Sequence, residues 1–227
     1  MAEPRKFTVT NMADFDHEAD IQKQRLNFPG SQYGDPRTLV SGLDAVFEKA
    51  LLGSEEDIQR VITANPYLLN YVTPNTGHHG TWVFPKRMIR TKRTDGTPGL
   101  IPDYLVASRN SLGFTWHIVE LKLAKVQFAN RKGTSFTRDA AEGIAQCAKY
   151  QAHFNDYIET IRSNIGVQEV ITPKSVILLI GDGQTESDVE QECRREFSIL
   201  CPNLIVASYD RIRRGLSNDL RHRNDLS

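Results

Sequence analysis

Three charged residues lie within apolar, strand-like stretches where packing alone would not require them. Asp103 lies in the stretch 100–108, and Glu120 and Lys122 lie near the end of the stretch 114–124. Side chains alternate between the two faces of a strand, so Glu120 and Lys122 are expected to point the same way. Neighbouring antiparallel strands lie about 4.8 Å apart. The sequence therefore predicts that two carboxylates and one ammonium group converge on a volume the size of a hydrated ion.

This combination of side chains favours metal-dependent phosphodiester hydrolysis. Buried carboxylates repel each other and lose solvation, so they need a compensating cation. Mg²⁺ binds through one or two carboxylates and leaves its other positions to water and phosphate oxygens, and Mn²⁺ could substitute for it. We expect Asp103 and Glu120 to bind the metal, with the main-chain carbonyl of Leu121 as a further ligand. Lys122 would orient or deprotonate the attacking water, or neutralise charge on the phosphate.

The elements that must position these residues follow from hydrophobic periodicity. Apolar residues recur at helical spacing in 39–51 and again in 54–64, where Ser54 is a good N-cap and Pro66 ends the helix. The order that follows is three strands, a long helix, a strand, a helix, a strand and a short last helix. These are predicted at residues 81–90, 100–108, 114–124, 135–163, 174–181, 185–200 and 203–209, and from Asp210 onward. Turn residues between the first three strands indicate an antiparallel meander, and continuous apolar strands flanking a helix indicate a parallel pair.

Composition limits the classes of protein to consider. Of the 227 residues, 39% are hydrophobic and 25% charged, which is typical of a soluble globular protein. The longest purely apolar run, 176–180, is too short to cross a membrane, and the first residues lack the apolar core of a signal peptide. Three widely spaced cysteines are typical of reduced thiols, so we expect a cytoplasmic protein with no membrane partner. Residues 1–37 are expected to form a partly ordered N-terminal extension, and residues 38–227 one α/β domain.

The charged residues occur in a pattern that resembles a known motif. Pro102-Asp103, followed by Glu120-Leu121-Lys122, is similar to the PD-(D/E)xK motif of restriction-type nucleases. The order of the predicted elements is also the one that this superfamily requires. The resemblance implies a restriction-endonuclease-like core, in which a mixed sheet combines an antiparallel meander with parallel strands and carries helices on both faces.

A second pair of residues extends the resemblance. Gln146 and Tyr150 are spaced i, i+4 in the long helical pattern, so both lie on one face of that helix. This pair resembles the QxxxY feature that RecB-like members of the superfamily place beside the metal site. The resemblance implies that both residues belong to the catalytic site.

Residues 54–216 resemble one family of this superfamily more specifically. Their segments are similar, in order and character, to the nuclease domain of Shedu defence proteins. In that family the helix before the strands carries a Glu, then a Gln and an Asn-Pro pair, and here Glu55, Gln59 and Asn65-Pro66 occupy those places. The resemblance implies a metal-dependent DNA endonuclease in prokaryotic antiphage defence, often a homo-oligomer. It makes Glu55 a further catalytic contact to metal or water.

Charge distribution bears on the DNA partner. The net charge is zero, so affinity for DNA would have to come from a local basic groove, from assembly of several subunits or from defence-system partner proteins. Lys125, Arg131 and Lys132 lie in the segment after Glu120 and could contact phosphates, although a solvated loop explains them equally well.

Other functions on the same fold are also compatible with the sequence. One is a catalytically silent nucleic-acid-binding sensor, against which the intact Asp, Glu and Lys set speaks. Another is a repair or recombination nuclease of the RecB-like class, which would prefer ends or junctions. A non-enzymatic oligomeric scaffold would leave the converging carboxylates without a purpose.

Overall fold

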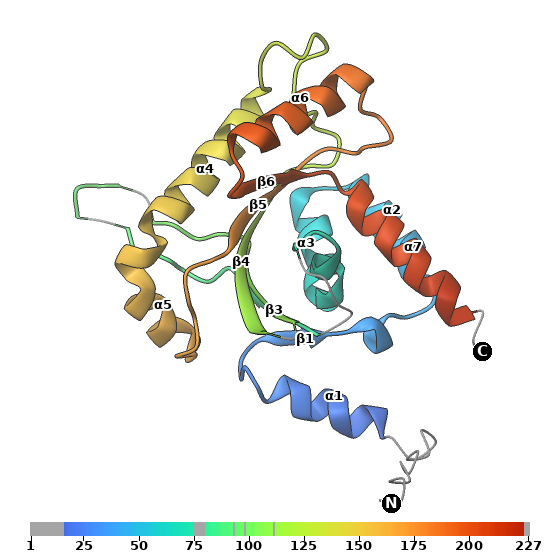
Figure 1. Ribbon diagram of the computed structural model, residues 1–227, viewed down its shortest axis with the longest axis vertical. Helices are drawn as coiled ribbons and strands as arrows, with labels where there is room; N and C mark the ends of the chain where they lie inside the picture. Colours follow the sequence, from blue (N-terminus) through green and yellow to red (C-terminus); the bar gives the residue numbers. More distant parts are fainter. Residues whose placement is uncertain (1–15, 75–79, 93, 98, 111, 225–227) are drawn as a thin grey trace, which may run out of the picture.

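The computed structural model describes residues 16–74, 80–92, 94–97, 99–110 and 112–224, and its centre is a six-stranded mixed sheet (Figure 1). The strand order is β1-β2-β3-β4-β5-β6. The strands are β1 (Gln32–Gly34), β2 (Thr81–Pro85), β3 (Tyr104–Asn110), β4 (Gly113–Leu121), β5 (Ser175–Leu179) and β6 (Leu204–Ala207). The α-helices are α1 (His17–Arg25), α2 (Leu43–Leu51), α3 (Glu55–Ala64), α4 (Arg138–Phe154), α5 (Ile158–Ile165), α6 (Asp188–Leu200) and α7 (Asp210–Asn224). Short 3-10 helices are η2 (Pro36–Thr38), η3 (Pro66–Tyr71) and η4 (Asn155–Tyr157).

The direction of pairing changes at β4. Strands β1 to β4 pair antiparallel in succession, whereas β5 pairs parallel with β4 and β6 pairs parallel with β5. From α2 onward the predicted order of two helices, three strands, helix, strand, helix and strand is confirmed, as are the meander and the parallel pair, whereas α1 and β1 lie in the segment predicted as an N-terminal extension. Strand β4 therefore has β3 beside residues 113–119 and β5 beside residues 117–121, so its C-terminal half lies inside the sheet.

Each face of the sheet carries its own core and its own helices. Helices α4, α5 and α6 cover one face, and α2, α3 and α7 cover the other (Figure 1). The alternation of β4 divides its residues accordingly, because Trp116 and Ile118 belong to the α4 side whereas Val119 and Leu121 belong to the α3 side. The helix starts follow their sequence signals: Ser54 and Asp57 form a capping box at α3.

Three predicted elements differ in extent from the observed ones. The strand predicted at 81–90 ends at Pro85, because Lys86 adopts a left-handed backbone with φ 49° and turns the chain. The strand predicted at 100–108 begins only at Tyr104, since Pro102 has no N–H to give to a ladder. The last helix, predicted as short, runs to Asn224.

The long helix predicted at 135–163 is also divided. Helix α4 ends at Phe154, the 3-10 turn η4 follows, and α5 begins at Ile158. Asn155 accepts a hydrogen bond from the Thr172 hydroxyl (2.7 Å), which anchors the turn to the segment before β5. The bend lets Phe154 and Ile161 both reach the same core.

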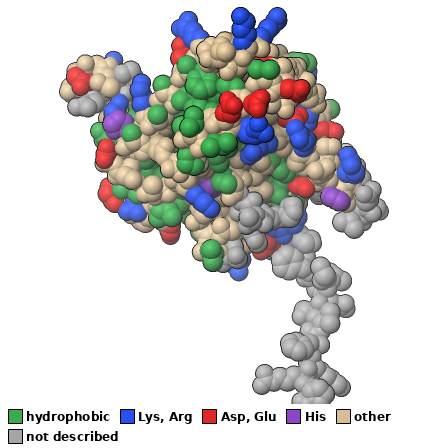
Figure 2. Space-filling view, turned by 45° about the horizontal axis from the view of Figure 1, so that its top comes forward, with side chains coloured by type: hydrophobic (Ala, Val, Ile, Leu, Met, Phe, Trp, Pro, Cys, Tyr) green, Lys and Arg blue, Asp and Glu red, His purple; other side chains and the backbone are tan. Residues whose placement is uncertain are grey.

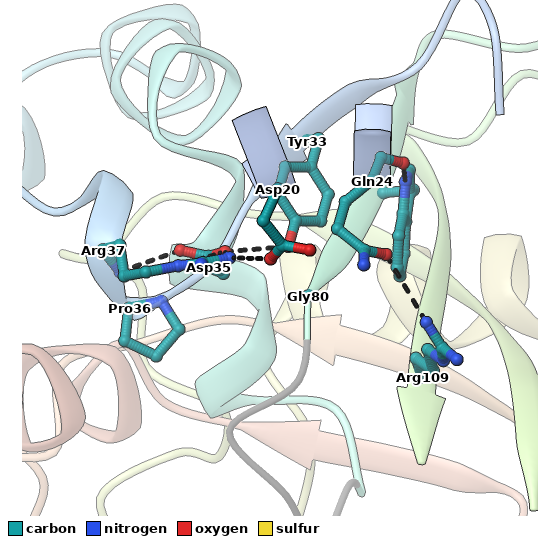
Figure 3. Close-up of a pocket in the computed structure, with 9 residues that line it drawn as sticks. Asp20, Gln24, Tyr33, Asp35, Pro36, Arg37, Gly80 and Arg109 are labelled. Atoms are coloured by element: carbon teal, nitrogen blue, oxygen red, sulfur yellow. Dashed lines mark hydrogen bonds and ion pairs between the residues drawn. The ribbon is translucent and has the colours of Figure 1, made fainter. Parts of the chain in front are cut away.

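Residues 16–38 are attached to the sheet through β1 and through ion pairs. The Arg37 guanidinium pairs with Asp20 (2.9 Å) and with Asp35, and Asp35 also accepts a hydrogen bond from the Tyr33 hydroxyl (2.8 Å), as Figure 3 shows. These side chains line a cavity of about 270 Å³ that also includes Arg109. Arg109 is near the end of β3 that lies away from Asp103, so the cavity is remote from the predicted chemistry. Its ion pairs fasten α1 to the rest of the fold.

Phe28 provides the apolar part of this attachment and a test of it. Its ring is 2% exposed and packs against Trp82, Phe84 and Trp116 with centroids 5.4–6.3 Å apart. Phe28→Ala should lower the free energy of unfolding by about 3–5 kcal/mol in urea denaturation, because it removes a buried aromatic ring. The matched change Leu26→Ala, at a side chain 74% exposed, should shift it by less than about 0.5 kcal/mol. Equal effects of the two changes would contradict the packing described here.

Candidate active site

The two predicted acidic residues lie opposite each other where β3 begins and β4 ends. Tyr104 pairs with Val119 in the β3–β4 ladder, and the same register continued by one residue places Asp103 opposite Glu120. Asp103 is 3% exposed and Glu120 is 4% exposed. Two neighbouring carboxylates are thus held out of water, which is costly unless each has donors or a cation beside it.

Asp103 has a donor at each oxygen. The main-chain N–H of Leu121 donates to its Oδ2 (2.6 Å), and the ammonium of Lys86 pairs with its Oδ1. Leu121 therefore reaches Asp103 through its N–H, while its side chain is buried in the core on the α3 side. Lys86 was not foreseen as a site residue.

Glu120 is held by Lys122 and Tyr150. The Lys122 ammonium donates to Oε1 (3.0 Å), which confirms that the two side chains point the same way, and the Tyr150 hydroxyl donates to Oε2 (3.1 Å). Burial and the charge of Asp103 raise the pKa of Glu120, and the contacts with Lys122 and Tyr150 oppose this rise only in part. The raised pKa of Glu120 shows that these two contacts offset its burial and the repulsion of Asp103 incompletely.

Lys122 is positioned by its main chain and by the helix above it. Its N–H donates to the Leu179 carbonyl (2.9 Å), and its own carbonyl accepts from the hydroxyl of the fully buried Tyr209 (2.7 Å). A side chain at Gly143 of α4 would clash with Leu178, so glycine there lets the helix pack closely on β5, beside the Lys122 stem. Burial alone would lower the pKa of Lys122, but the charge and hydrogen bond of Glu120, together with the charges of Glu55 and Asp103, outweigh burial and raise it.

Glu55 approaches the same cluster from the other face. It is the first residue of α3 and is half-buried. Burial raises the pKa of Glu55, and the charges of Lys122 and Asp103 act on it in opposite directions. The structure therefore brings Glu55 within electrostatic range of Asp103 and Lys122.

The remaining predicted residues lie on α4 and in the loop that precedes it. Gln146 lies one turn before Tyr150 on α4, and both line a cavity of about 450 Å³ whose wall also includes Lys149. The three predicted phosphate contacts are exposed in the loop between β4 and α4: Lys125, Arg131 and Lys132. Asn130 orders that loop, because its side-chain oxygen accepts from the N–H groups of Lys132 and Thr134.

The donor set suits a hard divalent cation held by few protein ligands. Within the described part of the chain, no group of three or more His, Cys, Asp or Glu side chains is arranged to hold a metal. Mg²⁺ needs only one or two carboxylates, because water and phosphate oxygens complete its shell. Asp103 and Glu120, both buried and mutually repelling, meet that requirement.

Two contributors were missed by sequence reasoning. Lys86 lies in a basic stretch, 85–93, that carried no positional signal by itself. Extending the β2–β3 register, in which Pro85 pairs with Tyr104, would have placed Lys86 beside Asp103. Tyr209 gave no comparable signal, because its contact with Lys122 depends on how β6 leads into α7.

The fold and site define an α/β protein with a buried carboxylate–lysine cluster at the end of its central strands. A comparison with family models matches residues 53–212 to the C-terminal domain of the Shedu protein SduA. The chain belongs to the Shedu family, and membership suggests a role in antiphage defence. No curated protein matches the sequence. Among the described residues, no helix is both long and apolar enough to cross a membrane.

His117 lies outside the cluster and provides a test of burial. Its Nδ1 is 2.9 Å from the Ser175 hydroxyl, and its Nε2 is buried without a hydrogen-bond partner. Burial, with a smaller contribution from Lys174, lowers the pKa of His117 from 6.5 to about 4.

Acid should therefore destabilise the fold through His117. Below pH 6.5 the unfolded chain binds a proton that the folded chain rejects, so the free energy of unfolding should fall by roughly 3 kcal/mol between pH 6.5 and 4 from this residue. Urea denaturation across that range should show a shallower loss for His117→Leu than for the parent. Parallel curves for the two proteins would mean that His117 accepts a proton in the folded state.

Proposed function

We propose that this chain is a metal-dependent DNA endonuclease of the PD-(D/E)xK type, acting in antiphage defence. The observation that carries the proposal is the buried pair Asp103 and Glu120 with the Lys122 ammonium 3.0 Å from Glu120. Two buried carboxylates that face each other need a cation, and a fixed lysine beside them suits a reaction at a phosphate.

Each residue has a separate task in this proposal. Asp103 and Glu120, with the Leu121 carbonyl, would hold Mg²⁺ or Mn²⁺. The bound ion would supply a more acidic water and neutralise charge on the phosphate. Tyr150 fixes one oxygen of Glu120, leaving Lys122 to orient the attacking water and to stabilise charge as it develops on the phosphate. Glu55 would contact a metal-bound water from the α3 side.

Gln146 and the basic loop would act on the DNA itself. Gln146 faces the cavity beside Tyr150, where a nucleotide next to the cleaved bond could be contacted. Lys and Arg side chains are interspersed with Asp and Glu on the face in Figure 2. DNA affinity would therefore come from local groups such as Lys125, Arg131 and Lys132, and from assembly of several copies of the chain.

Removal of the central charges should abolish cleavage without unfolding the protein. Glu120→Gln or Lys122→Met should each reduce nicking of a supercoiled plasmid by at least about 100-fold, because one removes a metal ligand and the other removes the charge facing the phosphate. The matched control is Glu142→Gln, at a carboxylate 57% exposed on α4, which should cleave like the parent. Melting temperatures should show that all three proteins are folded.

The same assay separates the proposal from its alternatives. Supercoiled, linear and single-stranded DNA are incubated with Mg²⁺, with Mn²⁺ or with EDTA. DNA binding without cleavage in any metal would identify a silent sensor. A strong preference for ends or junctions, with DNA-damage sensitivity after gene loss, would identify a repair nuclease. Full Mg²⁺-dependent activity in Glu120→Gln would refute the site assignment.

The basic loop should contribute affinity that depends on salt. Replacing Lys125, Arg131 and Lys132 together by Met should weaken DNA binding and reduce the slope of log affinity against log salt by about one for each phosphate that is no longer neutralised. Fluorescence anisotropy over a salt series measures both quantities. A triple control replaces exposed cations elsewhere, at Lys49, Lys174 and Arg195. Identical slopes for the two triple variants would show that the loop is merely solvated.

A further inference from the structure

Lys86 has a backbone that lysine rarely adopts. Among the described residues it alone, apart from glycines, has a positive φ, at 49°. Its main-chain N–H donates to the Asp103 carbonyl (2.9 Å), and its ammonium pairs with the Asp103 carboxylate. Both ends of Lys86 are therefore fastened to one residue, and the left-handed backbone is what allows the side chain to turn back onto it.

The two partners of this ion pair differ in how free they are to move. The Asp103 side chain is 4% exposed, whereas that of Lys86 is 53% exposed. The other donor to Asp103 is the Leu121 N–H, which the sheet holds in place. The ammonium is thus the only donor of the two that can leave the carboxylate without unfolding a strand.

A place for the displaced ammonium lies beside it. Pro85 and Lys86 form one wall of an open groove of about 600 Å³, and α3 forms another with Gln59 and Arg60. The cations Lys86 and Arg60 border this groove, and so does the carboxylate of Glu56. Arg60 also pairs with Asp57 (2.9 Å), which leaves Lys86 as the cation nearer to Asp103. A phosphate of a bound strand there would attract the Lys86 ammonium away from Asp103.

We propose that Lys86 is an exchangeable internal counter-ion: its ammonium holds the cation position at Asp103, and a divalent metal ion replaces it when a DNA phosphate draws it into the groove beside α3. This inference rests on the proposed function and adds to it a positioning residue that couples the substrate to the metal. Metal binding at Asp103 and phosphate binding in the groove both require the Lys86–Asp103 ion pair to break. DNA therefore strengthens metal binding, and the metal strengthens DNA binding, by the same factor. The free protein would therefore hold its metal weakly until DNA is present.

The first test measures Mn²⁺ affinity of the DNA-free protein by electron paramagnetic resonance. Lys86→Met and Lys86→Gln should bind Mn²⁺ about tenfold more tightly than the parent, since the competing ammonium is gone. Lys86→Arg keeps a cation and should bind like the parent. Lys92→Met, at an exposed lysine of the same basic stretch, is the matched control and should also bind like the parent. Two different neutral replacements guard against one that folds poorly.

The second test measures the coupling itself. A duplex with phosphorothioate linkages, which slow cleavage, is added at saturation and the Mn²⁺ titration is repeated. The duplex should tighten Mn²⁺ binding to the parent several-fold, and should change binding to Lys86→Met little. Equal tightening in both proteins would overturn the exchange.

The outcomes separate this inference from the proposed function. A parent protein that cleaves DNA and binds Mn²⁺, with both neutral Lys86 variants binding it no more tightly, would overturn the role of Lys86 alone. A parent protein that neither binds Mn²⁺ nor cleaves DNA would overturn both. Tighter binding in the neutral variants but not in Lys86→Arg or Lys92→Met supports the exchange of cations at Asp103.

Discussion

The constraint on which this site depends is the burial of two carboxylates side by side. Asp103 and Glu120 lie opposite each other where water cannot screen their repulsion. Lys86 and the Leu121 N–H compensate the first, and Lys122 and Tyr150 compensate the second. These donors come from the end of β2, from β4 and from α4, so the site exists only when the sheet and the covering helix are both assembled.

The two carboxylates and Lys122 are positioned by the change from antiparallel to parallel pairing at β4. Antiparallel pairing with β3 brings Asp103 opposite Glu120. Parallel pairing with β5 places the Leu179 carbonyl where it accepts a hydrogen bond from the Lys122 N–H. An antiparallel neighbour alone would leave the end of β4 free to fray. Two main-chain N–H groups hold the segment 120–122, because that of Leu121 donates to Asp103 and that of Lys122 donates to Leu179.

Patterns with a short period were enough to predict much of this arrangement. Alternation in the strand predicted that Glu120 and Lys122 share a direction, and the i, i+4 spacing predicted that Gln146 and Tyr150 share a face. What failed depended on single backbone conformations or on distant contacts. The left-handed turn at Lys86 ends β2 early, and the bond from Thr172 to Asn155 marks where the long helix bends. Neither feature alters the hydrophobic periodicity of the sequence, so periodicity does not predict it.

The short strand β1 has a consequence for where this domain can be said to begin. The family match starts at residue 53, yet Gln32–Gly34 pairs with β2 and Phe28 packs beneath it. Without that segment, the apolar strand Thr81–Pro85 would become the open edge of the sheet, with unpaired N–H and C=O groups ready to join another chain. Strand β1, which precedes the matched region, thus covers the edge of β2. Because β1 is only three residues long, it exposes few unpaired N–H and C=O groups to another chain.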